Sequence, residues 1–432
     1  MTNLFAARSQ MALSLAFHII FAVIGIGMPL LMVLAEWRWL RTRDTTYRTL
    51  ARQWAKGTAI LFAVGAVSGT VLSFELGLLW PGFMAKAGPI IGMPFSLEGF
   101  AFFIEAIFLA IYLYGWDRVS ERAHFLAGIV VAVSGLSSAA FVMAVNSWMN
   151  APVGFVLDNG RLVGIDPIAA MLNPAWPTLT LHMVLASYAA TGFGVAGVHA
   201  LRLRRAPSAF HRAALGLALL MAAPAAILQP VSGDIAARMD ARRQPAKLAA
   251  MEGLFQTQRG APLLLGGVPD AESRTVPGSI AIPKGLSLLA FHDPNAEVTG
   301  LDRVPRDQWP PLAPVRIAWQ LMVALGSWLA FVAVVAGWRL LRHIPPERDR
   351  WWLTAIALSA PLGFVALEAG WVVTEVGRQP WVIYGVLRTA DVVTPMPGLA
   401  VPLVMFTLLY LWLFGVVAFL LKRMVMSEPE AA

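Results

Sequence analysis

The chain has 432 residues, of which 58% are hydrophobic and only 13% are charged. A soluble protein carries about a quarter charged residues, so this composition excludes an ordinary soluble domain and indicates a polytopic membrane protein. The net charge of +8 comes from arginines that cluster between apolar runs, which does not suggest nucleic-acid binding. The sequence has no cysteine. Disulfides, iron–sulfur clusters and covalently attached haem are therefore excluded, and any haem would need His, Met or carboxylate ligands.

Runs of about twenty apolar residues predict membrane-spanning helices. Nine runs of this kind lie at 11–35, 55–78, 95–115, 124–146, 177–200, 213–231, 316–340, 351–377 and 397–421. The first run is too long for a cleaved signal peptide, and its basic residues follow it instead of preceding it. The sequence therefore predicts an all-α, polytopic membrane helix bundle of about nine transmembrane helices.

Lysine and arginine gather in every second loop of this bundle. The loop after the first span is the richest, with Arg38, Arg41, Arg43, Arg48, Arg52 and Lys56. Because short cytoplasmic loops carry the excess of positive charge, this pattern predicts an N-terminus outside and a C-terminus inside. The odd number of spans agrees with termini on opposite sides of the membrane.

A long segment separates the sixth predicted span from the seventh. The chain is thus divided into residues 1–230 with six spans, an outer segment at 231–315, and residues 316–432 with three spans. Long connections of this kind are usually functional or disordered. We expect a short helix from Gln244 to Leu254, with Pro245 in its first turn, and turn-rich coil in the rest of the segment.

Several side chains that are costly in lipid lie in or beside the spans. They are His18, Glu98, Glu105, His182, Met322, Glu375 and Arg378. The threading brings all of them toward the outer face, and an ionisable residue at membrane depth indicates a functional site. Two histidines, a methionine and carboxylates at one depth predict metal or haem ligands and a proton route.

Only two of the histidines lie well inside apolar spans, namely His18 and His182. A histidine that forms a hydrogen bond between helices is the alternative to a ligand. Met322 gains meaning as a partner of His182, since His and Met form a six-coordinate electron-transfer pair; alone, a core methionine is commoner. Four others are expected to be solvated at inner helix ends or in loops: His124, His199, His211 and His343.

The acidic pair Glu98 and Glu105 is separated by seven residues. Seven residues make two helical turns, so both carboxylates face one side of the helix, about 10 Å apart along its axis. This spacing suits a proton relay. The alternative is a pair of helix–helix contacts, with Glu98 solvated at the start of its helix.

Near the end of the eighth span, Glu375 and Arg378 have the i, i+3 spacing that allows an ion pair on one helix face. Such an arginine can bind a cofactor carboxylate, for example a haem propionate. The alternative is an arginine that extends to the membrane surface. In the long segment, Lys247 and Glu252 are ordinary loop charges at face value. They point about 140° apart around a helix, so one ligand need not touch both.

A set of short motifs in a fixed order resembles a known family. They are Arg8-Ser9-Gln10 with Phe17-His18, the stretch from Pro94 to Glu105, Asn146-Ser147-Trp148-Met149-Asn150, Thr180-Leu181-His182-Met183, the stretch from Gln244 to Glu252, and Gly377-Arg378-Gln379-Pro380-Trp381. The chain resembles subunit I of cytochrome bd-type quinol oxidase over nearly its whole length, in a form similar to the short Q-loop, cyanide-insensitive branch.

The resemblance implies a terminal oxidase that oxidises quinol at the outer face and reduces O₂ to water, in the cytoplasmic membrane of a bacterium. It implies two haem b groups, one low-spin and one high-spin, and one haem d, all held without covalent bonds. By this likeness His182 and Met322 ligate the low-spin haem, while His18 and Glu375 ligate the two high-spin haems. Which of these two haems each residue holds is left open.

The resemblance also assigns roles to residues around the haems. Glu98 and Glu105 match the proton-pathway carboxylates, and Trp371 and Arg378 match residues beside the haem pair. Two residues of the Q-loop, Lys247 and Glu252, match its quinol-binding positions. The implied partners are membrane ubiquinol or menaquinol, O₂, the lipid bilayer, a second oxidase subunit and small single-helix subunits.

One departure from the family pattern concerns Gln320, because the family often has arginine two positions before the methionine ligand. Two other functions stay open at this point. A haem-free proton-coupled transporter would use the same carboxylates, but it predicts broken helices and inverted repeats, which the sequence lacks. An electron-transfer-only cytochrome b usually pairs two histidines within one helix, and no predicted span here does so.

Overall fold

The computed structural model describes residues 2–424, and this part of the chain contains nine helices that are long and apolar enough to cross a membrane. Their bounds are α1 Asn3–Thr42, α2 Thr45–Leu79, α3 Pro81–Tyr114, α4 Glu121–Asn150, α6 Trp176–Arg205, α7 Ala209–Arg243, α10 Leu312–Leu341, α11 Arg350–Val376 and α12 Ala400–Met424. The predicted number of spans is confirmed. Most helices extend beyond the predicted runs, because polar caps prolong them past the apolar stretch. For example, Thr2 caps the start of α1 and Arg43 ends it in a left-handed conformation.

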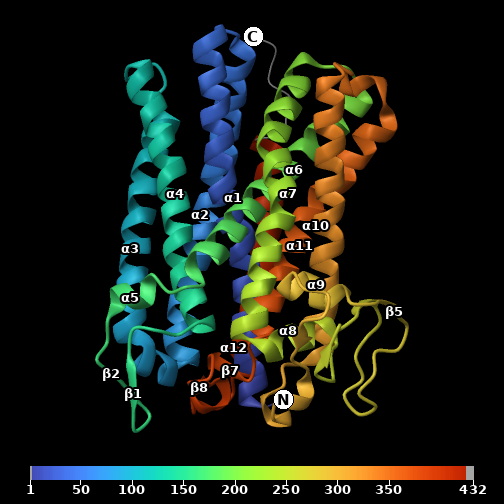
Figure 1. Cartoon of the computed structure of the whole chain (residues 1–432). Coiled ribbons are helices and arrows are strands. Elements are labelled where there is room, and N and C mark those ends of the chain that lie inside the picture. Colours follow the sequence, from blue (N-terminus) through green and yellow to red (C-terminus); the bar gives the residue numbers. More distant parts are fainter. Residues whose placement is uncertain (1, 425–432) are drawn as a thin grey trace.

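The long helices form two groups of four with one additional helix (Figure 1). Helices α1, α2, α3 and α4 pack together, and α6, α7, α10 and α11 form the second group. Helix α6 contacts α1 and α4 and so joins the groups, while α12 packs against α1 and α2. Small residues allow the close approach: a Cβ atom at Gly27 of α1 would lie 2.5 Å from the Thr191 side chain of α6.

The shorter elements gather at one end of the bundle, which we call the loop end (Figure 1). They are α5 Pro167–Met171, α8 Pro245–Glu252, α9 Gly285–Phe291, β1 Val156–Asp158, β2 Arg161–Val163, β3 Gln258–Arg259, β4 Leu263–Gly266, β5 Ser279–Ile282, β6 Glu297–Val298, β7 Trp381–Ile383 and β8 Leu387–Arg388. The strands form antiparallel pairs β1–β2, β3–β6, β4–β5 and β7–β8. The start of α1 lies at the loop end, and α12 runs from it to the opposite end, which we call the far end.

The segment between α7 and α10 is more ordered than the sequence suggested. The predicted short helix is confirmed as α8, and its first residue is Pro245. The expectation of turn-rich coil beyond it is wrong in part, because this stretch forms β3 to β6 and α9. These elements have two to seven residues each, and hydrogen bonds between distant positions hold them, such as Leu301 N to Leu254 O at 3.0 Å. A pattern confined to a few residues does not show such pairing.

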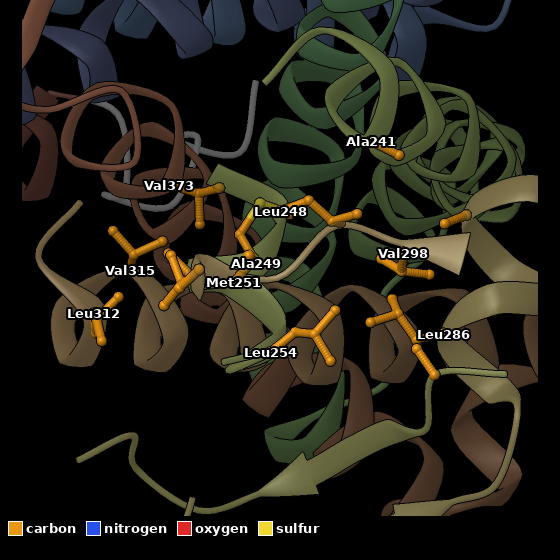
Figure 2. Packing of buried hydrophobic residues seen from close by; sticks show 14 of the residues in the cluster. Ala241, Leu248, Ala249, Met251, Leu254, Leu286, Val298, Leu312, Val315 and Val373 are labelled. Atoms are coloured by element: carbon orange, nitrogen blue, oxygen red, sulfur yellow. The ribbon is translucent and has the colours of Figure 1, made fainter. Parts of the chain in front are cut away.

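The same segment shares a hydrophobic core with the long helices that it adjoins. Figure 2 shows Leu248, Ala249, Met251 and Leu254 from α8 and the residues after it, packed with Leu286, Val298, Leu312, Val315 and Val373. Since Leu312 and Val315 belong to α10 and Val373 belongs to α11, the segment is fixed onto the second group of helices. It forms a packed cover over one part of the loop end.

A fully buried arginine reinforces this attachment. The guanidinium of Arg316 in α10 donates hydrogen bonds to four main-chain carbonyl oxygens of the segment, at 3.1 Å to Met251, 3.1 Å to Gly267, 2.9 Å to Leu264 and 2.7 Å to Gly266. Buried carbonyl groups need partners, and one cation supplies all four. Gln320, one turn further along α10, also donates to Gly266 at 3.0 Å.

We expect Arg316→Met to loosen the β4–β5 pair, because the variant keeps the apolar stem but removes the donors from four carbonyl groups. Hydrogen bonds to charged groups contribute about 1.5–3 kcal/mol each, so local opening should increase by at least about a hundredfold. Hydrogen–deuterium exchange of the amides at 263–282 measures this opening. Arg259→Met is the control, since the Arg259 side chain is 79% exposed. Unchanged exchange in Arg316→Met would contradict the anchoring role.

Candidate functional site

His18 in α1 is held by a serine of the neighbouring helix. Its Nδ1 lies 3.0 Å from Ser68 Oγ in α2, and the Ser68 hydroxyl also lies 2.9 Å from the carbonyl oxygen of Val64. The single hydroxyl hydrogen can be donated to that carbonyl, so the oxygen accepts from the Nδ1–H of His18. The ring then carries its lone pair on Nε2, which is the form that binds a metal. A Cβ atom at Gly69 would lie 2.9 Å from His18 Cε1, so the glycine makes room for the ring.

His182 in α6 has the same surroundings. Its Nδ1 lies 2.9 Å from Ser232 Oγ in α7, and Ser232 donates to the Gln229 carbonyl at 2.9 Å. The Gln229 side-chain amide lies 3.1 Å from His182 Nε2, which fits a lone pair on that nitrogen. A Cβ atom at Gly233 would lie 3.3 Å from the ring.

These two serines were missed in the sequence, although a signal was present. The tripeptide Val-Ser-Gly occurs at 67–69 in α2 and again at 231–233 in α7, each time beside one of the two histidines.

Two neighbouring residues of α11, Gly370 and Trp371, face different helices. A Cβ atom at Gly370 would lie 3.0 Å from Met322 Sδ, so the thioether is packed against α11. The next residue, Trp371, packs in a small cluster that contains Ile19 and Met183. Since these neighbours adjoin His18 and His182 in the sequence, Trp371 lies between the surroundings of the two histidines.

The predicted Glu375–Arg378 pair is present at 2.7 Å. Asn146 of α4 donates to the other oxygen of Glu375 at 2.5 Å, which connects the two groups of helices. Arg378 is only 1% exposed, so the alternative of an arginine that extends to the membrane surface is wrong. Its Nε and Nη1 atoms have no hydrogen-bond partner within residues 2–424. Buried donors of this kind indicate a site for an additional acceptor, such as a carboxylate.

Glu98 and Glu105 both face α4, as their spacing predicted. Glu98 accepts a hydrogen bond from Ser138 Oγ at 3.3 Å. Glu105 is 5% exposed, and a Cβ atom at Gly135 would lie 3.3 Å from one of its oxygens. The structure therefore places the two carboxylates along the α3–α4 interface and not toward lipid.

Lys247 and Glu252 in α8 are buried, so their description as ordinary loop charges is wrong. Lys247 pairs with Asp240 at 3.2 Å, and Glu252 accepts from Trp319 Nε1 at 2.9 Å. Burial raises the pKa of Glu252 to about 7, although the charge of Arg316 and the Trp319 hydrogen bond act in the opposite direction. The two residues have separate partners, in agreement with their predicted angular separation.

Three comparisons with known proteins place this geometry in context. A family model described as cytochrome bd terminal oxidase subunit I matches residues 6–429. The solved bd oxidase from Geobacillus thermodenitrificans is 41% identical, with a TM-score of 0.93 over 99% of both chains. The chain belongs to the cytochrome bd terminal oxidase subunit I family.

Curated relatives in this family include two from Bacillus subtilis (strain 168). The putative cytochrome bd menaquinol oxidase subunit I is 37% identical over 99% of this chain and 98% of its own length. The cytochrome bd ubiquinol oxidase subunit 1 is 30% identical over 100% of this chain and 95% of its own length. Membership makes this chain part of a quinol:oxygen oxidoreductase, so the haem-free transporter and the electron-transfer-only cytochrome are wrong.

A cytochrome carries haem, and the side chains present here fit that group. Two imidazoles with Nε2 lone pairs and a thioether are suitable axial ligands, and carboxylates such as Glu375 are also possible ligands. The unpartnered N–H groups of Arg378 suit a propionate. Glycines at 69, 233 and 370 leave space beside His18, His182 and Met322.

Other buried polar residues of this bd-family chain were not predicted. Glu75 is 3% exposed and accepts from Gln10 at 2.9 Å, and Tyr410 donates to Ser14 at 2.9 Å, which ties α12 to α1. The signal for Glu75 was a charged residue inside an apolar run. The expectation that His124 and His199 are solvated is wrong, because both are buried at 3% and 8% exposure. Their helices continue past the apolar runs, and neighbouring helices cover these side chains.

We expect Arg378→Gln to lower the haem content of the purified oxidase, because the variant removes a buried cation with free donors. A charge-assisted hydrogen bond contributes about 1.5–3 kcal/mol, so retention should fall about tenfold or more. Haem per protein, determined after extraction, measures this loss. Arg388→Gln is the control, since Arg388 pairs with the exposed Asp307 at the surface. Equal haem in both variants would exclude Arg378 as a cofactor contact.

Proposed function

We propose that this chain holds the haems of a membrane quinol oxidase through four axial ligands. His182 and Met322 would hold a low-spin haem b, and His18 and Glu375 would serve the two high-spin haems, one b and one d. The observation that carries the proposal is the matched pair of histidines, each with Nδ1 at a serine hydroxyl and the lone pair on Nε2. When bound, the haems supply one-electron redox chemistry and, where an axial position is open, the place where oxygen is reduced.

The quinol would bind at α8, within the packed segment between α7 and α10. Glu252 has a pKa near neutrality and can accept a proton from quinol, as a general base does. Lys247, paired with Asp240, can orient a quinol oxygen. Lys247 also lies against the helix end that carries Arg378, since a Cβ atom at Gly377 would lie 3.1 Å from Lys247 Cγ. The relatives' names include both menaquinol and ubiquinol, so either head group is a candidate.

Protons for oxygen reduction would travel along α3. Glu105 and Glu98 lie on one face of that helix, and Glu98 is nearer the loop end. The arginine-rich connections α1–α2 and α3–α4 lie at the far end, which supports an inside position for that end. Proton uptake from inside and quinol oxidation outside would separate charge across the membrane. Trp371, between the two histidines, would be positioned beside the haems. A second oxidase subunit and small single-helix subunits would complete the complex.

We expect His182→Ala and Met322→Leu each to remove the low-spin haem signal while the oxygen-reactive haems stay largely in place. Each variant would lose one of the two ligands proposed for this haem. Reduced-minus-oxidised absorption spectra of the purified complex measure this effect. His343→Ala, at an exposed position, and Met221→Leu, in the core of the far end, are matched controls. A full low-spin spectrum in both test variants would show that the ligand assignment is wrong.

We expect quinol oxidation to increase with pH through about 7, because only the deprotonated carboxylate of Glu252 can accept a quinol proton. Glu252→Gln should slow quinol oxidation and remove this pH dependence, while oxygen uptake with an artificial one-electron donor persists. Initial rates from pH 5.5 to 8.5 with both donors measure the two effects. Glu297→Gln, on an exposed strand, is the control. A retained pH dependence in Glu252→Gln would assign the proton acceptor to another group.

A further inference from the structure

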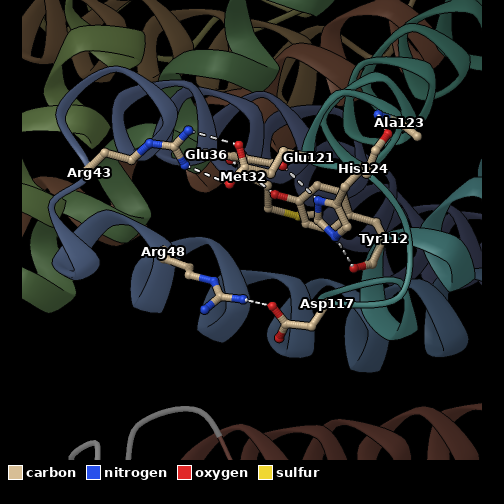
Figure 3. Close-up of polar contacts among 10 residues, drawn as sticks. Met32, Glu36, Arg43, Arg48, Tyr112, Asp117, Glu121, Ala123 and His124 are labelled. Atoms are coloured by element: carbon tan, nitrogen blue, oxygen red, sulfur yellow. Dashed lines mark hydrogen bonds and ion pairs between the residues drawn. The ribbon is translucent and has the colours of Figure 1, made fainter.

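A polar cluster lies inside the far end, away from the proposed haem ligands. Glu36 of α1 is fully buried, and His124 of α4 is 3% exposed. The Nδ1 atom of His124 lies 2.7 Å from Glu36 Oε1, and its Nε2 atom lies 2.9 Å from the main-chain carbonyl of Tyr112 in α3 (Figure 3). The cluster thus connects three helices of the first group.

The hydrogen-bond partners determine how many protons this cluster holds. A carbonyl oxygen only accepts, so His124 Nε2 must carry a hydrogen. The Nδ1 atom faces a carboxylate oxygen, and a contact of this length requires one proton between them. The pair is therefore either an imidazolium with a carboxylate or an imidazole with a carboxylic acid. Both forms are neutral overall, so the proton can move within the pair without placing a net charge in a region of low dielectric.

The second carboxylate oxygen of Glu36 offers a route by which a proton can leave the Glu36–His124 pair. Glu36 Oε2 is buried and has no hydrogen-bond partner in the part of the chain that the structure describes. The hydroxyl of Tyr112 lies close to this carboxylate, and its contact to the Met32 carbonyl is long, at 3.4 Å. The hydroxyl thus has two acceptors within reach. The Met32 carbonyl makes only a long contact, and Glu36 Oε2 has no other donor. The hydroxyl can turn between them.

Tyr112 continues the row of carboxylates on α3. Glu98, Glu105 and Tyr112 follow each other at intervals of seven residues, so they share one helix face with steps of about 10 Å. The facing side of α4 has Gly128 opposite Tyr112 and Gly135 opposite Glu105.

The surface next to the cluster carries exposed charges. Arg48 pairs with Asp117, and Arg43 with Glu121 at 2.7 Å (Figure 3). The acidic partners are 67% and 50% exposed, so they can exchange protons with water.

We propose that Glu36, His124 and Tyr112 form a proton-loading site for Glu105. A proton from the far-end surface joins the pair, Glu36 protonates the Tyr112 oxygen, and the Tyr112 hydroxyl proton leaves toward Glu105. The pair then returns to its single shared proton, so no net charge accumulates. A helical step of about 10 Å exceeds hydrogen-bond reach and requires bridging water. This inference rests on the proposed role of Glu105 in proton delivery.

The test uses the purified oxidase complex in lipid vesicles, fed with quinol. Tyr112→Phe and Glu36→Gln should slow turnover and the linked proton uptake about tenfold, which is less than the ~10²–10⁴-fold typical of a positioned acid–base group because water can substitute in part. Haem spectra and haem reduction by quinol should stay normal. Tyr114→Phe, on the same helix at 69% exposure, and Glu272→Gln, at an exposed position of the loop end, are matched controls that should turn over normally.

Glu105→Gln, measured in parallel, separates the two proposals. Slow turnover in Glu105→Gln with normal turnover in Tyr112→Phe and Glu36→Gln overturns the loading site alone. Normal turnover in all three variants overturns the Glu105 route and the loading site together. Lower thermal stability with normal turnover per haem would show that the cluster only holds α1, α3 and α4 together, which also overturns the proposal. If Glu36→Gln fails to assemble, Tyr112→Phe decides, since it removes a single oxygen.

Discussion

The hydrogen bond from Asn146 to Glu375 is the contact on which the rest of the site depends. It joins α4 of the first helix group to α11 of the second, and Glu375 in turn holds Arg378. From the same helix end, Asn150 accepts from Gln244 at the start of the long segment, at 2.6 Å to its carbonyl. A buried polar group that loses its hydrogen-bond partner costs about 1–3 kcal/mol. Two helix groups and a loop segment are therefore set relative to one another by a few amide and carboxylate groups.

The buried charged residues discussed above are of two kinds: those whose polar atoms all have partners in the protein, and those with atoms that lack a partner. Arg316 donates to four carbonyl groups, so its role is to hold the loop segment in place. Arg378 and Glu36 are equally buried but retain atoms without partners. Native structures leave few such atoms, so an unpartnered atom on a buried charged group indicates a site for a further partner. The loop end and the far end each contain a cluster of this second kind, around Arg378 and around Glu36.

The nine spans could be predicted because lipid imposes a long apolar run on each helix, and the Glu375–Arg378 pair because helix geometry fixes an i, i+3 contact. Side-chain contacts between different helices could not be predicted from the sequence. Ser68 and Ser232 support the histidines only because α2 lies against α1 and α7 against α6. The burial of His124 likewise depends on α1 supplying Glu36. Gln320, which departs from the family pattern, donates to Gly266 beside Arg316, and this contact depends on the folding of a segment distant in sequence.

The close packing of α3 on α4 has a consequence for how this subunit can vary. Gly128 and Gly135 of α4 lie directly against Tyr112 and Glu105 of α3, so each large side chain of α3 packs onto a glycine of α4. Deleting one residue between Glu105 and Tyr112 would turn everything beyond it by about 100° and point Tyr112 away from α4. Substitutions on the lipid side of α3 leave this alignment intact. The sequence of α3 can therefore vary away from α4 while its length cannot, and insertions or deletions are tolerated better in the loop that follows it.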